Sequence, residues 1–298
     1  MDLSSTNLRV LCQIAESGSF TAAAAELGYT QSAVSRQAIA LERSAGATLF
    51  ERRPDGVRLT SQGLTLLRYA RTILASVDAA SRDLAGEPGT ARVRLGVVPS
   101  AGPVLLTAAL DRLAATAPWI QVTTREGTTP ALVRALRSGS IDLAVLTSRP
   151  PHRPPDGESP GLHLTTVQDV ELLVAASANG QFAGRTSVHV DELLDASWIS
   201  TPSPSSEPQL GVWPGLPGRA RVAHGTKDWL TKLHLVAGGF GITTVPDPMT
   251  AVLPPDVITL RVEGAPREVR RILVARSPGA ATQAITAVTV ALTAGYPR

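Results

Sequence analysis

The chain has 298 residues, of which 43% are hydrophobic and 18% are charged. This length excludes a peptide-sized module and allows two domains with sizeable cores. Because no long polar or single-sign tract interrupts it, the sequence predicts a folded rather than a disordered chain. Aromatic residues make up only 4%, so we expect an aliphatic core and no wall of stacking rings for single-stranded nucleic acid.

Charge and cysteine content narrow the class of protein further. The formal net charge is +3 and the pI is about 9.5, but arginine raises the pI without forming a patch, so this is weak support for nucleic-acid binding. The single cysteine, Cys12, permits no internal disulfide, and no Cys/His cluster has zinc spacing. The amino terminus lacks the features of a signal peptide, and no apolar run is long enough to cross a membrane, which predicts a cytoplasmic protein.

Two helices are predicted at the amino terminus. Apolar residues recur at helical spacing from Leu8 to Ala15, and Gly18 ends that segment. Ser19 can then cap a short, alanine-rich helix over 20–27.

A third helix and a hairpin follow. Thr30 is suited to cap a helix over 31–45, whose apolar residues form one buried stripe. Two short extended pieces then flank the Pro-Asp-Gly turn at 54–56. Three helices and a hairpin predict a winged helix-turn-helix.

A longer helix is predicted from Ser61 to Leu84. Its apolar positions alternate three and four apart, which is the spacing of a coiled-coil seam and predicts a contact between subunits. The alternative is a helix that packs on its own domain. The seam residues are Leu67, Ala70, Leu74, Val77, Ser81 and Leu84.

The pattern changes after residue 91. Residues 86–91 form a linker, and short strand-like runs then alternate with helical segments, which predicts a parallel α/β sheet. Residues 149–161 contain five prolines and are expected to form a surface loop. Helices are expected over 105–117, near 190–194 and over 280–294.

The segment from Ala22 onward resembles the LysR-type transcriptional regulators. Residues 30–53 follow the family pattern Ser-Gln-x-Ala-Val-Ser-x-x-Ile-x-x-Leu-Glu, then Gly, then Leu-Phe-x-Arg, and 59–63 match its Leu-Thr-x-x-Gly. The glycine-rich turn at 237–246 and the strand after a Gly-x-x-Asp at 139–146 extend the resemblance over the whole chain. Two departures, Ala38 and Ala45, lie in the buried stripe and bear on packing rather than on DNA contact. The matching residues are Gln31, Ala33, Val34, Ser35, Leu41, Glu42, Gly46, Leu49, Phe50 and Arg52.

The resemblance implies the architecture. A winged helix-turn-helix DNA-binding domain, here called the head, occupies 1–60, and a dimerising linker helix occupies 61–86. An effector-binding domain over 92–298 is then expected to resemble periplasmic binding proteins. Its two α/β lobes are lobe I (about 92–163 and 266–298) and lobe II (about 164–265). The implied partners are double-stranded promoter DNA, a small effector held between the lobes, and further copies of the chain in a homodimer or homotetramer, with no membrane partner.

DNA recognition is expected on the exposed face of the third helix. Short polar and amide side chains there can reach base edges in the major groove, while arginines of the wing take phosphates. One observation points the other way, because residues 1–90 contain nine arginines and nine acidic residues and are net neutral. The candidate DNA-binding residues are Thr30, Gln31, Ser32, Ser35, Arg36, Gln37, Arg52, Arg53 and Arg58.

Effector binding is expected where strands end and helices begin. Ligands of α/β sheets lie at the carboxyl ends of strands, where helix N-termini offer free amides, and hydroxyl groups at these places suit a carboxylate. Each such residue can alternatively be an ordinary helix cap. The candidates are Ser100, Thr128, Thr129, Thr147, Ser200, Thr201, His224 and Thr226.

Two alternatives to a ligand-responsive regulator remain. One is an enzyme on a binding-protein fold with an accessory helical domain; the other is a DNA-binding protein whose carboxy-terminal region only oligomerises. The chain has no nucleophile elbow, Walker loop, HExxH or dinucleotide fingerprint. We therefore predict a non-enzyme without cofactor, catalytic residues or metal. With Cys12 as the only cysteine, a peroxide switch that uses two effector-domain cysteines is excluded.

Overall fold

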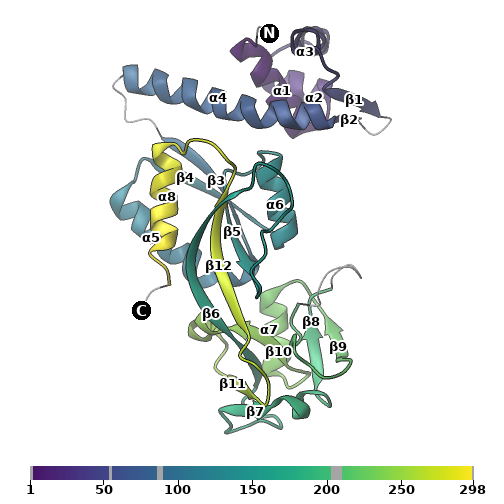
Figure 1. Cartoon of the computed structure of the whole chain (residues 1–298), viewed down its shortest axis with the longest axis vertical. Coiled ribbons are helices and arrows are strands. Elements are labelled where there is room, and N and C mark those ends of the chain that lie inside the picture. Colours follow the sequence, from purple (N-terminus) through teal and green to yellow (C-terminus); the bar gives the residue numbers. More distant parts are fainter. Residues whose placement is uncertain (1–2, 54–55, 86–89, 203–209, 297–298) are drawn as a thin grey trace.

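A computed structural model of the chain describes residues 3–53, 56–85, 90–202 and 210–296. The helical amino-terminal unit lies at one end, and helix α4 (Ser61–Ala85) crosses above the α/β region (Figure 1). Two long strands, β6 (His163–Ser177) and β12 (Val269–Arg276), run down the α/β region and join its upper part to its lower part.

The head forms the predicted helices and wing. Helix α1 ends at Gly18, whose φ is +64°, and the Ser19 hydroxyl accepts a hydrogen bond from the Thr21 amide at 3.2 Å. The Thr30 hydroxyl accepts one from the Ala33 amide at 3.2 Å. The elements are α1 (Ser5–Ser17), α2 (Phe20–Leu27), α3 (Gln31–Ala45), β1 (Phe50–Arg53) and β2 (Gly56–Leu59).

Two contacts fix the wing to the helices. One carboxylate oxygen of Glu42 accepts hydrogen bonds from the amides of Leu49 at 2.8 Å and Phe50 at 3.1 Å. On the other strand Gly56 has a φ of +135°, and a Cβ there would lie 2.6 Å from the carbonyl oxygen of Gly18. Glycine is therefore required where β2 crosses the α1–α2 turn.

The structure contradicts part of the predicted seam on α4. Leu67, Ala70 and Leu74 are buried within the head's own hydrophobic cluster, at 2%, 0% and 8% exposure. They face inward because α4 packs along α1, so the alternative of a helix packed on its own domain is correct for these three residues. Val77 is exposed, and the side chains of Ser81 and Leu84 lie outside the described residues.

The upper sheet is built around three parallel strands. β3 pairs with β4 on one side and β5 on the other, and β12 runs antiparallel to both β5 and β6. Helices α5 and α8 cover one face and α6 covers the other (Figure 1). The buried side chains of this core are all Ala, Val, Leu or Ile, as the composition predicts. The elements are β3 (Ala91–Val97), β4 (Ile120–Glu126), β5 (Leu143–Ser148), α5 (Thr107–Thr116), α6 (Thr129–Arg137) and α8 (Gln283–Thr293).

The lower part has two sheets and its own cores. Strands β10 and β11 pair antiparallel with the end of β6, and β7 pairs parallel with β11. Strands β8 and β9 form a separate parallel pair. Trp198 of β8 is buried in a hydrophobic cluster of the lower part, and its indole NH donates a hydrogen bond to the Leu193 carbonyl at 3.1 Å. The elements are β7 (Ser187–His189), β8 (Ser197–Ser200), β9 (Arg221–Gly225), α7 (Trp229–Ala237), β10 (Thr243–Pro246) and β11 (Val257–Glu263).

Short helical turns depart from the prediction. The helix expected near 190–194 is a 3₁₀ turn, η3 (Val190–Leu193). The helix expected from residue 105 begins earlier, with a 3₁₀ turn η1 (Pro99–Ala101) and a π-helical turn η2 (Gly102–Leu106) before α5. A further 3₁₀ turn, η4 (Asp247–Val252), was not predicted. Such turns are too short to leave a periodic hydrophobic pattern.

Candidate DNA-binding and effector-binding sites

The exposed side of α3 presents polar groups together. Gln31, Ser32 and Arg36 are exposed, and Ser35 is half-buried beside them. The opposite side holds the helix in the head through Val34, Ala38 and Leu41. Ala38, one of the two departures from the family pattern, is 2% exposed and leaves the polar side unchanged.

Two of the candidate DNA-binding residues, Thr30 and Gln37, differ from the others in their surroundings within the head. Thr30 caps α3, and its hydroxyl lies 3.1 Å from that of Ser32. Gln37 is half-buried, and its Oε1 is enclosed with no hydrogen-bond partner among the described residues. Gln37 is therefore less accessible than Gln31 and Arg36, which are exposed.

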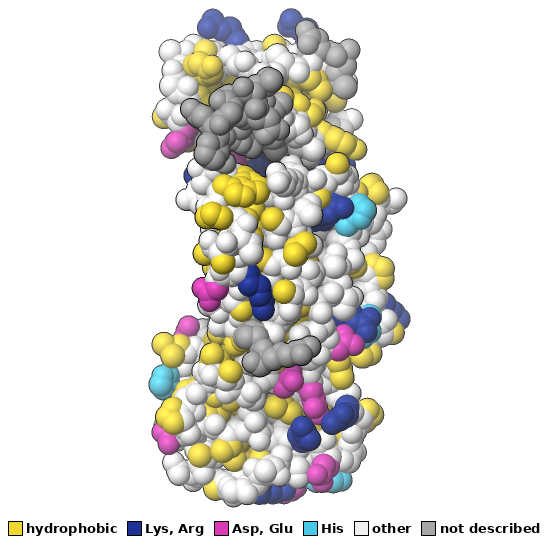
Figure 2. Space-filling model, turned by 90° about the vertical axis from the view of Figure 1, so that its left-hand side faces the viewer, with side chains coloured by type: hydrophobic (Ala, Val, Ile, Leu, Met, Phe, Trp, Pro, Cys, Tyr) yellow, Lys and Arg dark blue, Asp and Glu magenta, His cyan; other side chains and the backbone are white. Residues whose placement is uncertain are grey.

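The wing supplies one described arginine. Arg58 on β2 is exposed, while the side chains of Arg52 and Arg53 on β1 lie outside the described residues. Residues 1–90 carry equal numbers of arginines and acidic residues, and in Figure 2 basic and acidic side chains are dispersed over the face of the molecule in view.

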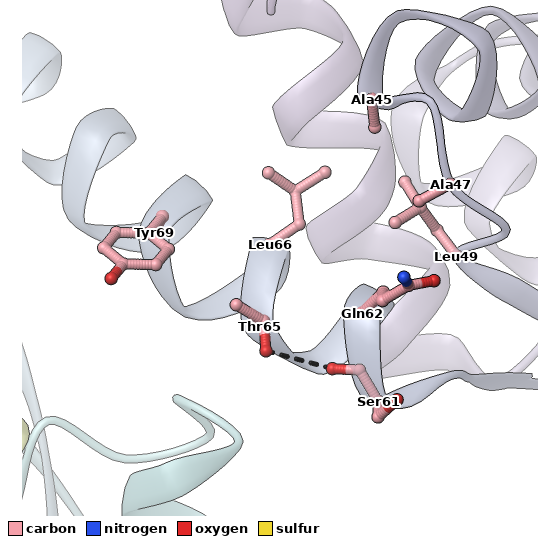
Figure 3. Close-up of a pocket in the computed structure, with 8 residues that line it drawn as sticks. All are labelled: Ala45, Ala47, Leu49, Ser61, Gln62, Thr65, Leu66 and Tyr69. Atoms are coloured by element: carbon pink, nitrogen blue, oxygen red, sulfur yellow. Dashed lines mark hydrogen bonds between the residues drawn. The ribbon is translucent and has the colours of Figure 1, made fainter. Parts of the chain in front are cut away.

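An apolar groove of about 330 Å³ opens between α4 and the end of α3. Leu66 projects from α4 across from Ala45 and Leu49, with Tyr69 one turn further along (Figure 3). The groove continues into a row of exposed apolar side chains on α4, because Tyr69, Ile73 and Val77 are 56%, 42% and 43% exposed. We call Leu66, Tyr69, Ile73 and Val77 the outer stripe of α4.

The linker helix also contacts lobe I. The Arg71 guanidinium donates to the carbonyl of Ser138 at 3.0 Å and to the Glu16 carboxylate at 3.2 Å. Ser138 directly follows α6, so the arginine lies at the negative end of that helix. Beside it Gly139 has a φ of +66°, and a Cβ there would lie 3.1 Å from Arg71 Cδ. These contacts join α1, α4 and α6.

The Gly-x-x-Asp motif has a structural role in lobe I. Asp142 accepts hydrogen bonds from the backbone amide of Arg94 at 2.8 Å and from its guanidinium at 2.7 and 3.1 Å. This paired arrangement raises the pKa of Arg94 despite the opposing effect of burial. It ties β3 to the start of β5.

The candidate effector residues of lobe I lie at one edge of the sheet. β3, β4 and β5 end side by side, since Val97 pairs with Glu126 and with Val145. Ser100 follows β3, and Thr128 and Thr129 follow β4, whereas Thr147 lies within the last two residues of β5, which ends at Ser148. The Thr129 hydroxyl lies 3.3 Å from both the amide and the carbonyl of Thr147.

Thr128 differs from an ordinary cap. It occupies the N-cap position of α6, but its side chain makes no capping hydrogen bond, and it is exposed. The first amides of α6 therefore receive no acceptor from Thr128, and they face the same edge as Ser100.

Lobe II brings its candidates to the ends of β8 and β9. The Thr226 amide donates to the Ser200 carbonyl at 2.9 Å, and Ser200 is 2% exposed. The Thr226 hydroxyl accepts from the Asp228 amide at 3.1 Å, which is the ordinary role of a residue before a helix. His224 is exposed, and its ring lies edge-on to the ring of Phe240, with 6.1 Å between the two ring centroids.

Sequence reasoning missed a buried lysine at this place. Lys232 is 1% exposed, and its Nζ donates to the Thr201 hydroxyl at 2.6 Å. The signal was present in the sequence, because Trp229, Lys232, Leu233 and Val236 follow the spacing of a buried helix stripe.

The His, Cys, Asp and Glu side chains of the described residues form no candidate metal site, since no three of them are placed to hold a metal ion. Cys12 is half-buried in the head, and burial raises the pKa of its thiol, which disfavours the reactive thiolate. His152 in the proline loop lies 3.0 Å from the Ser148 hydroxyl.

Family models match both parts of the chain. Residues 5–64 match the model described as bacterial regulatory helix-turn-helix protein, lysR family, and residues 86–295 match LysR substrate binding domain. The chain belongs to the LysR family. It is a DNA-binding transcription regulator with an effector-binding domain, and regulators of this family bind DNA and small molecules and form oligomers. No helix in the described part of the chain has the length and apolar character needed to cross a membrane.

Individual relatives cover nearly the whole chain. A probable hydrogen peroxide-inducible genes activator of Mycobacterium avium is 30% identical over 280 residues, which cover 91% of this chain and 87% of the relative. CbnR in complex with its target DNA aligns with a TM-score of 0.58 at 21% identity, covering 97% of this chain and 99% of that one. LysG of Corynebacterium glutamicum with bound effector Arg aligns with a TM-score of 0.67 at 17% identity, covering 98% and 97%. At these identities the two structures establish the fold.

Proposed function

We infer that this regulator responds to a small anionic effector, whose binding between lobes I and II alters the placement of the DNA-binding heads in the dimer or tetramer. The observation that carries this proposal is the edge formed by β3, β4 and β5. Ser100 follows β3 in the η1 turn, and the exposed Thr128 precedes α6, whose first amides its side chain does not cap. Free amides and hydroxyls together favour a carboxylate or similar anion.

The division into lobes at 92–163 with 266–298, and 164–265, belongs to this proposal. Separate hydrophobic clusters support two lobes, because the core around β3 and β5 contains no buried residue from 172 to 262, and two further clusters lie within that range. The clusters favour a boundary further along β6 than residue 163, since Val170 belongs to the core around β3 and β5, and the first part of β6 pairs with β12 up to Glu171. In the described part of the chain β6 runs from one part to the other, since its first half pairs with β12 and its end pairs with β10 and β11. Such a connection permits the two parts to change their angle.

DNA contact is assigned to α3 and the wing. We propose that Gln31, Ser32, Ser35 and Arg36 reach base edges, while Arg58 takes a phosphate. Arg52 and Arg53, the other proposed phosphate ligands, retain that assignment from the sequence alone. A promoter-binding regulator of this kind would act in the cytoplasm.

The subunit contact is assigned to the outer stripe of α4. A second copy of the chain is the proposed occupant of the groove and stripe, because the family forms oligomers and both features are apolar. Pairing two nearly neutral heads on one duplex multiplies their separate affinities through effective concentration. The weak charge of the head then suffices for stable binding.

A screen of small organic acids by thermal unfolding tests the effector proposal. An acid at 100 times its dissociation constant should stabilise the protein by about 2.7 kcal/mol. Replacing Ser100 with Phe should abolish this stabilisation by filling the space after β3, and Ser100→Ala should weaken binding by about 0.5–1.5 kcal/mol.

Two results would count against the proposal. If Ser100→Phe bound the acid as the wild type does, this edge would not be the site. If the acid were converted to a product while operator DNA was not bound, the enzyme alternative would replace a regulator.

A further inference from the structure

Lys232 lies where a helix normally places an apolar residue. On α7 it shares the inward face with Leu233 and Val236, and its exposure is 1%. A charged side chain is costly in such a place unless a partner of opposite charge offsets its desolvation. The chain contains only one other lysine, Lys227, which is exposed five residues earlier.

The partners of the Lys232 ammonium do not neutralise it. Nζ donates to the Thr201 hydroxyl at 2.6 Å and lies 4.9 Å from the centroid of the Trp229 ring. No acidic side chain among the described residues forms an ion pair with it, and burial lowers its pKa to about 8. The group remains mostly protonated at neutral pH, with three N–H donors and one hydroxyl acceptor in the described part of the site.

The ammonium stands at a place where α/β sheets bind ligands. Thr201 directly follows β8, which is parallel to β9, so both carboxyl ends meet beside it (Figure 1). Ligands in such sheets bind at the carboxyl ends of strands. Because the Thr201 oxygen accepts from Lys232, its own hydroxyl proton is free to donate. The Lys232 ammonium and the Thr201 hydroxyl can therefore both donate hydrogen bonds to one anion.

We propose that Lys232 and Thr201 bind the carboxylate group of a small organic acid, and that Lys232 determines the effector's charge. This inference rests on the proposed function and identifies the chemical class of its effector. A carboxylate receives a charge-assisted hydrogen bond from Nζ and a second bond from the Thr201 hydroxyl. A neutral amide of the same shape leaves the ammonium uncompensated, so the site rejects it.

The experiment compares acids with their amides on the full chain. Acetate, propionate and benzoate are titrated by calorimetry and thermal unfolding, each beside acetamide, propionamide or benzamide. We expect the wild type to bind at least one acid and to bind the matched amide far more weakly. Lys232→Met should weaken acid binding by roughly ten- to hundredfold, the loss of a charged hydrogen bond, and Lys227→Met should bind as the wild type does.

A second readout separates binding from packing. Because Lys232→Met removes a buried charge, its melting temperature without ligand should equal or exceed that of the wild type. Thr201→Val, which keeps the shape of the side chain but removes the hydroxyl, should weaken binding of the acid several-fold. This variant carries the test if Lys232→Met does not fold.

The outcomes distinguish this inference from the proposed function. If Lys232→Met or Thr201→Val bound the acid at full strength, Lys232 would not be the anchor, although an anionic effector could still bind beside Ser100. Equal binding of acid and amide by the wild type would overturn the charge selection. If no acid bound the wild type, but the protein still bound operator DNA, the anionic effector itself would be wrong.

Discussion

Arg36 and Arg58 are both exposed arginines of the head, but their positions predict different effects on DNA binding. Arg36 lies on the polar side of α3, where side chains of a groove-inserted helix meet base edges. Arg58 lies on a wing strand, where an arginine meets phosphates.

Arg36→Ala should reduce binding to the specific site by roughly 1–3 kcal/mol and leave binding to random duplex almost unchanged. Arg58→Ala should weaken both duplexes alike and flatten the dependence of affinity on salt. Fluorescence anisotropy over a series of salt concentrations measures both effects. Equal losses on both duplexes for Arg36→Ala would show that the base-reading face is elsewhere.

Some residues of the family pattern are explained by the fold rather than by DNA. Glu42 belongs to the family pattern, and its carboxylate accepts hydrogen bonds from two backbone amides at the start of the wing. Asp142 likewise fixes β3 to β5. A motif in one sequence shows that a residue type is needed, but only the contacts show whether it binds a ligand or the backbone.

At the scale of elements, α4 has two apolar sides with different roles. Leu74 is 8% exposed and belongs to the core of the head, whereas its neighbour Ile73 is 42% exposed on the outer stripe. Of these two adjacent positions, Leu74 therefore contributes to the fold of the head, and Ile73 is available for the proposed contact between subunits.

Ile73→Asp should leave the fold of the chain intact and dissociate the oligomer, because the charge enters an apolar contact between subunits. Leu74→Ala should instead lower the free energy of unfolding by about 2–5 kcal/mol, the cost of truncating a buried leucine. Light scattering reports the mass, and circular dichroism reports thermal unfolding. A stable monomer from Leu74→Ala with an unaffected oligomer from Ile73→Asp would reverse the assignment of the two sides.

Long elements were predictable from sequence and short ones were not. The bounds of α2 and α3 follow from their caps, since Ser19, Thr30 and the following glycines mark each end. The inner side of α4 was misassigned because a three-four spacing is shared by a coiled-coil seam and by a helix packed in its own domain. Only the contacts with α1 separate these two cases.

The candidate effector site was predictable only in part. Strand ends place hydroxyls at one edge, so Ser100, Thr128 and Thr147 could be grouped from their positions after strands. Lys232 was overlooked because its importance comes from burial, which its polar side chain obscures in a hydrophobicity pattern. Its pairing with Thr201 joins residues 31 positions apart, which no local pattern predicts.

At the scale of the molecule, helix α6 connects the candidate effector edge with the head. Its first turn follows Thr128, and the carbonyl of Ser138, directly after its last residue, accepts a hydrogen bond from Arg71 of the linker helix. A shift of α6 on effector binding would therefore reach α4 directly. Gly139 permits this contact, because a Cβ there would meet the Arg71 side chain.

Gly139→Ala should destabilise the protein more than Gly184→Ala. Both glycines have positive φ, +66° and +74°, but a Cβ at Gly184 would meet no atom within 4 Å. Backbone strain alone costs on the order of 1 kcal/mol at each, and the excess at Gly139 comes from Arg71. Thermal unfolding should show that this excess disappears in an Arg71→Ala background; an excess that persisted there would mean that Arg71 does not form the contact.

The central claim is that an anionic effector changes how the paired heads lie on DNA. A hydroxyl-radical footprint of the full chain, on a duplex selected from a random pool, measures this directly with and without a saturating acid found in the screen. We expect the protected positions to change in extent or spacing when the acid is bound, and to remain unchanged for Ser100→Phe. An identical footprint with and without the acid, although calorimetry shows the acid bound to the protein on DNA, would contradict the account.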